Sequence, residues 1–223
     1  DYKRAELYMS LSLSYFKLGD FERGEKYLQK SNNIRAKLDD KRGILLNYAR
    51  LSSIFISKRD FKRVIGICNE ALKVEPNLVE FYIIRGYAYA KLNKYERAIK
   101  DYEKAIALNP NFAEAYNNRG AAYAELNRYE QAIKDYEKAI ALNPNFAEAY
   151  GNRGIVYSEI QRYEESARDL KKAGILFFHS GREEDAVKTF SFCFKLRNKI
   201  ENDDIVYCGL ALLLLTSDAD VMN

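Results

Sequence analysis

The spacing of small and apolar residues along the chain predicts helices that come in pairs. Tyr116, Gly120 and Tyr123 lie three or four residues apart and share one helical face, which predicts a first helix. Residues 132–139 have the same period and predict a second helix that ends before Pro144. A polar break separates the two stretches, so the pattern indicates a helical hairpin.

This hairpin belongs to an internal repeat. Tyr95 to Tyr116 and Tyr129 to Tyr150 have the same sequence, except that Arg97 replaces Gln131. The two copies start 34 residues apart. A single helical hairpin cannot bury its apolar side, whereas a stack of hairpins can. The duplication therefore gives each hairpin a neighbour.

Three successive units carry the residues of a known repeat. In each unit, the predicted first helix carries two aromatic residues with a pair containing Gly or Ser between them. The predicted second helix carries a small or apolar residue followed by a larger one, and a proline comes after it. In one unit these are Tyr116, Arg119, Gly120, Tyr123, Ala132, Tyr136, Ala139 and Pro144. The arrangement resembles the tetratricopeptide repeat, with Arg in place of the usual Leu. The resemblance implies an all-α fold: a right-handed superhelical α-solenoid of about five stacked antiparallel helix pairs, plus C-terminal capping helices.

The repeat divides the chain into units of unequal regularity. The predicted units are an atypical long first repeat at 1–44, repeats at 45–78, 79–112 and 113–146, a degenerate repeat at 147–181 and C-terminal capping helices at 182–223. In the first repeat, residues 36–42 are expected to lengthen the second helix and its loop. The helix at 163–179 fits both a second helix and a new first helix. Either part of the period has been lost, or the array ends and 181–217 packs as a cap, which we favour.

The most apolar stretch is "IVYCGLALLLL" at 205–215. It reads either as a docking helix for a partner or a second copy, or as a terminal helix that covers the last hairpin or begins a cut-off repeat. We favour the covering helix, because the ends of a solenoid need covering. An apolar outer face that stayed exposed would favour homo-oligomerisation through this helix.

Composition bears on several functional classes. The net charge of +4 is too small to imply a polyanionic partner. Lysines of the second helices alternate with acidic residues, so no nucleic acid is expected as a partner. No apolar run is long enough to span a membrane, so no membrane partner is expected either. The chain begins with Asp1 rather than Met, as a piece of a longer protein would.

Residues suited to catalysis or metal binding are few. The three cysteines fall on apolar faces without a metal-binding spacing, which predicts reduced, buried thiols in a cytoplasmic protein. The single histidine, His179, has no Cys or carboxylate constellation around it in the sequence. We therefore expect no metal, no cofactor and no enzymatic activity.

Opposite charges recur at a fixed spacing in three units. Arg85, Arg119 and Arg153 are each followed sixteen residues later by an aspartate, at Asp101, Asp135 and Asp169. Units with Leu in place of this Arg carry Tyr or Ile in place of the Asp. We predict an Arg–Asp pair between the two helices of each hairpin, because a paired Arg can be buried where a lone one cannot. The alternative is two exposed charges with coincidental phasing.

The face opposite the packing side of each first helix is the expected binding surface. In tetratricopeptide arrays this face lines a concave groove that receives peptides, so the resemblance supplies the role. The predicted peptide-binding residues are Arg50, Glu80, Ile84, Tyr87, Glu114, Asn117, Asn118, Glu148 and Asn152. Glu80, Glu114 and Glu148 would repel a carboxylate, where chaperone-binding members carry a clamp of Lys, Asn and Arg.

The resemblance also bears on how a peptide would be held. Asn118 and Asn152 are similar to the asparagine ladder of O-linked N-acetylglucosamine transferase arrays, and an Asn can both donate to and accept from a backbone. We therefore expect a protein or peptide partner with a neutral or basic extended segment. These side chains could equally be solvated without a role. The expected function is a non-enzymatic adaptor or scaffold; the alternative is a peptide-sensing regulatory module of a larger protein.

Overall fold

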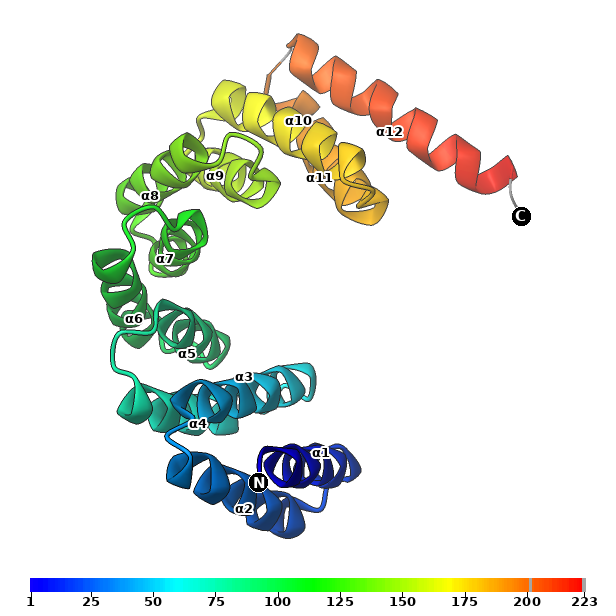
Figure 1. Cartoon of the computed structure of the whole chain (residues 1–223). Coiled ribbons are helices and arrows are strands. Elements are labelled where there is room, and N and C mark those ends of the chain that lie inside the picture. Colours follow the sequence, from blue (N-terminus) through cyan, green and yellow to red (C-terminus); the bar gives the residue numbers. More distant parts are fainter. Residues whose placement is uncertain (201, 222–223) are drawn as a thin grey trace. The chain divides into compact units, whose positions relative to one another are not determined.

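The computed structural model describes residues 1–200 and 202–221, and side chains up to residue 215 (Figure 1). That part of the chain is helical and has no strand. Its elements are α1 (Tyr2–Leu18), α2 (Phe21–Lys37), α3 (Lys41–Ser57), α4 (Phe61–Val74), α5 (Val79–Lys91), α6 (Tyr95–Leu108), α7 (Ala113–Glu125), α8 (Tyr129–Leu142), α9 (Ala147–Glu159), α10 (Tyr163–His179), α11 (Glu183–Lys195), η1 (Leu196–Asn198) and α12 (Asp203–Val221).

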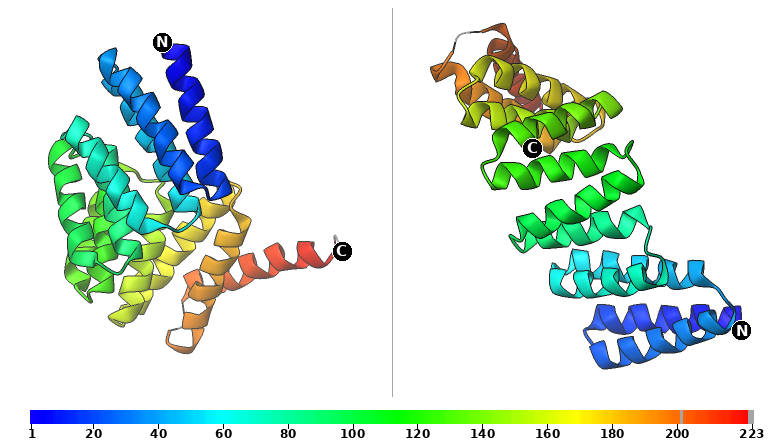
Figure 2. Two further views of the ribbon diagram at one scale, coloured as in Figure 1. Left: turned by 90° about the horizontal axis from the view of Figure 1, so that it is seen from below. Right: turned by 90° about the vertical axis from the view of Figure 1, so that its left-hand side faces the viewer.

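The helices form two compact units, Asp1–Asn109 and Pro110–Asn223. In the first unit, α1 packs on α2, α3 on α4, and α5 on α6. In the second, α7 packs on α8 and α9 on α10, while α11 and α12 follow against α10. Figure 2 shows these pairs as antiparallel hairpins within each unit. The predicted all-α stack of helix pairs is therefore confirmed.

Turns within the hairpins depend on one residue in the left-handed backbone region. Asn93 and Asn127 have φ of 56° between the helices of their hairpins, and Asn tolerates this region better than most residues. Gly19 and Gly181 do the same at φ of 86° and 74°. The polar dipeptides that interrupt the helical pattern are thus the turns.

Small residues let the paired helices approach closely. A Cβ added to Gly120 would lie 2.9 Å from the Tyr136 ring and 3.2 Å from the carbonyl oxygen of Ala132. In the first hairpin the glycine lies on the second helix, as Gly24 of α2, and a serine, Ser12, takes its place on α1. The Ser12 hydroxyl donates a hydrogen bond to the carbonyl of Gly24 at 2.8 Å. A helix crossing with no room for a side chain on one partner therefore recurs in both units.

Helix α10 performs the two roles that its sequence allows. It pairs with α9, where Gly154 lies against Leu170. It also packs on α11, where Gly174 lies against the ring of Phe190 with the same sixteen-residue spacing. One helix thus serves as the second helix of one hairpin and the first helix of the next.

The first hairpin is longer than the others because an ion network holds its extra turn. Arg35, near the end of α2, is 4% exposed and pairs with Glu6 and Asp40. Asp40 also accepts a hydrogen bond from the Gly43 backbone at 2.8 Å and so caps α3. Helix α3 therefore begins at Lys41, four residues before the predicted repeat boundary at 44/45.

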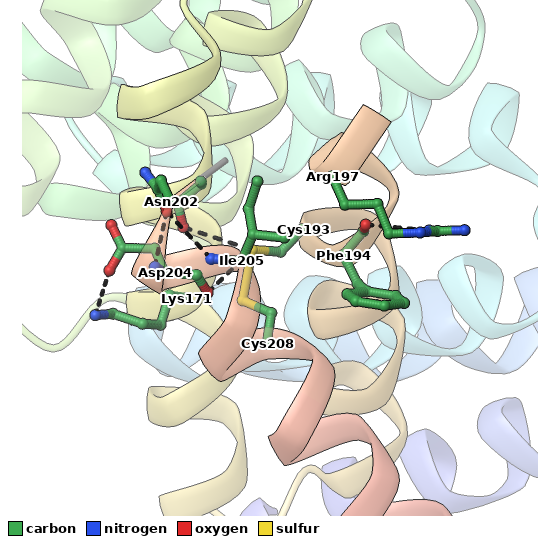
Figure 3. The surroundings of a disulfide bond; sticks show 9 residues. Lys171, Cys193, Phe194, Arg197, Asn202, Asp204, Ile205 and Cys208 are labelled. Carbon is green, nitrogen blue, oxygen red and sulfur yellow. Dashed lines mark hydrogen bonds and ion pairs between the residues drawn. A yellow bond between two sulfur atoms is a disulfide. The ribbon is translucent and has the colours of Figure 1, made fainter. Parts of the chain in front are cut away.

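The prediction of three reduced thiols is wrong for two of them. Cys193 of α11 and Cys208 of α12 form a disulfide, with Cα atoms 6.2 Å apart (Figure 3). The turn between these helices brings the cysteines together: Asn202 accepts the backbone N–H groups of Asp204 and Ile205 and so starts α12. Only Cys68 remains a free thiol.

Helix α12 is covered on one side only. Ile205 and Cys208 are buried against α10 and α11, and Lys171 of α10 pairs with Asp204. Five apolar side chains on the remaining face are 44–69% exposed: Val206, Tyr207, Leu210, Leu213 and Leu214. The helix therefore covers the last hairpin and leaves an apolar face of its own.

Candidate functional site

Three arginine–aspartate pairs link the helices of the hairpins α5/α6, α7/α8 and α9/α10. In α7/α8, Arg119 Nε donates to Asp135 Oδ2 at 2.8 Å and its Nη2 donates to Oδ1 at 2.7 Å. Arg85 with Asp101 and Arg153 with Asp169 have the same two-pronged geometry. This fork places both oxygens of each carboxylate on one guanidinium and fixes the register of the two helices.

The surroundings of these pairs are largely shielded from water. Asp135 is 6% exposed, and the Arg119 guanidinium carbon lies 5.7 and 5.8 Å from the rings of Tyr116 and Tyr123. Burial raises the pKa of Asp169 above its ordinary value, and the hydrogen bonds from Arg153 offset only part of that rise. A buried charge in such a position depends on its oppositely charged partner.

A row of asparagine amides lies on the first helices of the second unit. Asn152 of α9 donates through Nδ2 to Asn117 Oδ1 of α7 at 3.1 Å, and Asn117 donates to Asn118 Oδ1 at 3.3 Å. Asn117 is 7% exposed and serves as the link. Among the described residues, Asn118 Nδ2 and Asn152 Oδ1 have no partner, so the row ends in a free donor and a free acceptor.

The acidic residues predicted for this surface differ in their surroundings. Glu114 is exposed at the start of α7. Glu148, at the matching place in α9, pairs with Arg182, which precedes α11. The predicted repulsion of carboxylates by Glu148 is therefore weakened by a cation that the sequence analysis did not consider. The two residues are 34 positions apart, one repeat period, and this spacing could have revealed the pair.

The remaining predicted residues lie in the first unit. Arg50 of α3 pairs with Glu6 of α1 at 3.2 Å. Glu80 is exposed at the start of α5, while Ile84 is half-buried against the apolar core. Tyr87 meets Phe61 edge-on at 6.1 Å between ring centroids. This surface is thus more apolar than the amide row of the second unit.

Other reactive groups do not form a catalytic constellation in the described part of the chain. Burial raises the pKa of Cys68 to about 12, so its thiol stays protonated. No group of three or more His, Cys, Asp or Glu side chains among the described residues could hold a metal ion. Across the same residues, no helix has both the length and the apolar content needed to cross a membrane.

Family models agree with the repeat pattern. Models of the tetratricopeptide repeat match residues 113–146, 135–168 and 5–38, and a model of the TPR repeat matches residues 86–127. Together they account for just over half of the chain. The chain is a tetratricopeptide repeat protein. A comparison with curated proteins returned no match.

Solved structures show the same fold. A crystal structure of MamA protein is 24% identical with a TM-score of 0.62, over 81% of this chain and 95% of that chain. A tetratricopeptide repeat protein from Parabacteroides merdae ATCC 43184 is 19% identical with a TM-score of 0.62, over 98% and 89%. The TPR2B domain of yeast Sti1, solved as a complex with pHsp70, is 26% identical with a TM-score of 0.53, over 55% and 98%.

Proposed function

We propose that the chain is a non-enzymatic adaptor that binds an extended segment of a partner protein on its first helices. The observation that carries this proposal is the amide row of α7 and α9. Its free donor at Asn118 and free acceptor at Asn152 complement the C=O and N–H of a peptide backbone. Recognition of a backbone by amides tolerates many side-chain sequences, as a scaffold needs.

The similarity to the TPR2B domain of yeast Sti1 supports a peptide partner, because that domain was solved with pHsp70. The charges on the surface support a proposal for the charge of the partner. Exposed Glu114 favours a neutral or basic segment, whereas Arg182 offsets the charge of Glu148. We place the segment along Asn118 and Asn152, with its basic side chains toward Glu114.

The experiment begins with peptides selected from a random library on the intact protein. Affinities are then measured by calorimetry for the wild type and for Asn118→Ala/Asn152→Ala. Loss of two backbone hydrogen bonds should weaken binding about tenfold. A matched control, Asn145→Ala/Asn198→Ala, removes two exposed amides off the first helices and should leave affinity unchanged. Selected peptides that bind Asn118→Ala/Asn152→Ala as tightly as the wild type would overturn the assignment.

A further inference from the structure

A separate surface of the first hairpin combines stacked tyrosines with positive charge. Helix α1 contributes Arg4, Tyr8 and Tyr15, and helix α2 contributes Tyr27 and Lys30. The rings of Tyr15 and Tyr27 stack with centroids 5.5 Å apart and planes within 5°. Tyr8 meets Tyr27 at 5.8 Å. We call these five residues the cation–tyrosine face.

Lys30 is held in place on this face by two rings. Its Nζ lies 5.4 Å from the centroid of Tyr8 and 5.1 Å from that of Tyr27. Among the described residues no carboxylate pairs with it. An ammonium group ordered in this way loses less side-chain entropy when an anion binds than a freely rotating surface lysine does.

Arg4 is oriented by the neighbouring phenol. Its Nε donates to the Tyr8 hydroxyl at 3.3 Å, and its guanidinium carbon is 5.6 Å from the Tyr8 centroid. The two terminal nitrogens have no partner in the described part of the chain, so they can grip both oxygens of a carboxylate. The hydrogen bond from Arg4 lowers the pKa of Tyr8, and Lys30 contributes to that shift, as a positive local field requires.

A cavity of about 470 Å³ opens beside this face. Arg4, Tyr8, Lys30 and Lys37 line it, and Asp1 is the only carboxylate among its lining residues. Three arginines elsewhere in the same unit are neutralised by carboxylates: Arg23 pairs with Asp20, Arg63 with Asp60 and Arg50 with Glu6. Within the described part of the chain, Arg4, Lys30 and Lys37 have no carboxylate partner, so three positive charges line this cavity against the one carboxylate of Asp1.

We propose that the cation–tyrosine face and its cavity bind an acidic segment of a partner protein. Arg4 takes one carboxylate through its terminal nitrogens, while Lys30 and Lys37 take neighbouring ones. A nucleic acid suits the face less well, because each tyrosine ring already stacks on another ring or a cation and offers no free platform to a base. This surface is distinct from the amide row and does not depend on it.

The test uses the intact protein and a labelled, blocked peptide of alternating glutamate and serine. Fluorescence anisotropy at low salt should show binding, which should weaken at about 0.5 M salt, where the screening length falls to a few ångströms. The variant Arg4→Gln/Lys30→Gln should weaken binding at least about tenfold. The control Lys134→Gln/Lys138→Gln removes the same net charge from exposed positions of α8 and should change affinity little.

Four further measurements decide the outcome. Arg4→Lys/Lys30→Arg keeps the charge and should retain most of the affinity, and circular dichroism should show that each variant is folded. Absence of binding at low salt, equal loss in the two glutamine variants, or equal binding of a glutamine–serine peptide would overturn the proposal. A thymidine oligonucleotide that binds more tightly than the acidic peptide, and loses affinity in Arg4→Gln/Lys30→Gln, would also overturn it and assign the face to nucleic acid.

Discussion

The hairpins α1/α2 and α7/α8 fill the same place between their helices in different ways. In α7/α8, Arg119 lies between two tyrosine rings and is neutralised by Asp135. In α1/α2, the tyrosines at the corresponding places are kept, but Leu11 replaces the arginine and Tyr27 replaces the aspartate. Tyr27 then stacks on the Tyr15 ring and meets the Tyr8 ring at a tilt of 39°.

The difference shows how one fold separates stability from recognition. The ion pair of α7/α8 satisfies its own charges, so nothing remains to attract a ligand. The tyrosine stack of α1/α2 needs no charge for its packing, and within the described residues Arg4 and Lys30 at its edge have no carboxylate partner. Aromatic rings thus replace a neutral ion pair between the helices, while the surface position of Lys30 carries a lysine in both hairpins, which is Lys138 in α8.

The largest expected effect comes from breaking one partner of the α7/α8 pair. Arg119→Leu leaves the carboxylate of Asp135 buried without a partner, which should cost about 3 kcal/mol of unfolding free energy. Asp135→Ile should also destabilise the protein, because it removes both hydrogen bonds that the Arg119 guanidinium donates to the carboxylate. The double variant should lie within about 1 kcal/mol of the wild type, as apolar replacements of buried pairs do. Urea unfolding of all four proteins gives the coupling energy, and additive effects would contradict a paired interaction.

A smaller effect is expected when the Arg–Asp pair of α7/α8 is introduced at the corresponding positions of the first hairpin. Tyr27→Asp alone should destabilise by about 2 kcal/mol, because two ring contacts of about 1 kcal/mol each are lost. Adding Leu11→Arg places a guanidinium between Tyr8 and Tyr15 and should restore most of that loss. Thermal unfolding of the single and double variants checks this. If Leu11→Arg brought no recovery, the two hairpins would not be interchangeable at this place.

The smallest effect is a difference between the pKa values of Tyr8 in the first hairpin and Tyr136 in α7/α8. Arg4 lowers the pKa of Tyr8, whereas burial raises the pKa of Tyr136. Tyr8 should therefore ionise first as pH rises, and its contribution to stability should grow between its folded pKa and the unfolded value near 10. Tyr136 has the opposite sign: its contribution is complete below pH of about 10 and is lost above it.

Ultraviolet difference spectra of Tyr8→Phe and Tyr136→Phe against the wild type assign these two titrations. High salt should move the Tyr8 transition upward and leave that of Tyr136 in place, because only the first is exposed to screening. Coincident transitions for the two residues would remove the electrostatic contrast between the hairpins.

Most of the fold could be predicted from the spacing of residues within one repeat. The 34-residue period predicts the helix pairs, because each hairpin meets the same neighbours as the last. The sixteen-residue spacing places Arg119 and Asp135 at the same level of antiparallel helices, and the structure has the pair there. Information of this kind lies within one repeat, so the sequence displays it directly.

Features that depend on departures from the period could not be predicted in the same way. Arg35 meets Glu6 across 29 residues in the longest of the hairpins. The disulfide of Cys193 and Cys208 depends on a turn after α11 that has no counterpart in the regular repeats. The link through Asn117 needs the packing of α9 on α7, which a single helix face does not reveal.

The disulfide alters how the C-terminal end would respond to mechanical load. A force applied to α12 is transmitted to α11 through the disulfide, and the chain between Cys193 and Cys208 bears little of that force. Cutting the bond with a reductant would place those residues in series with the load. The chain could then extend by roughly 50 Å before α11 felt tension, at about 3.5 Å for each released residue.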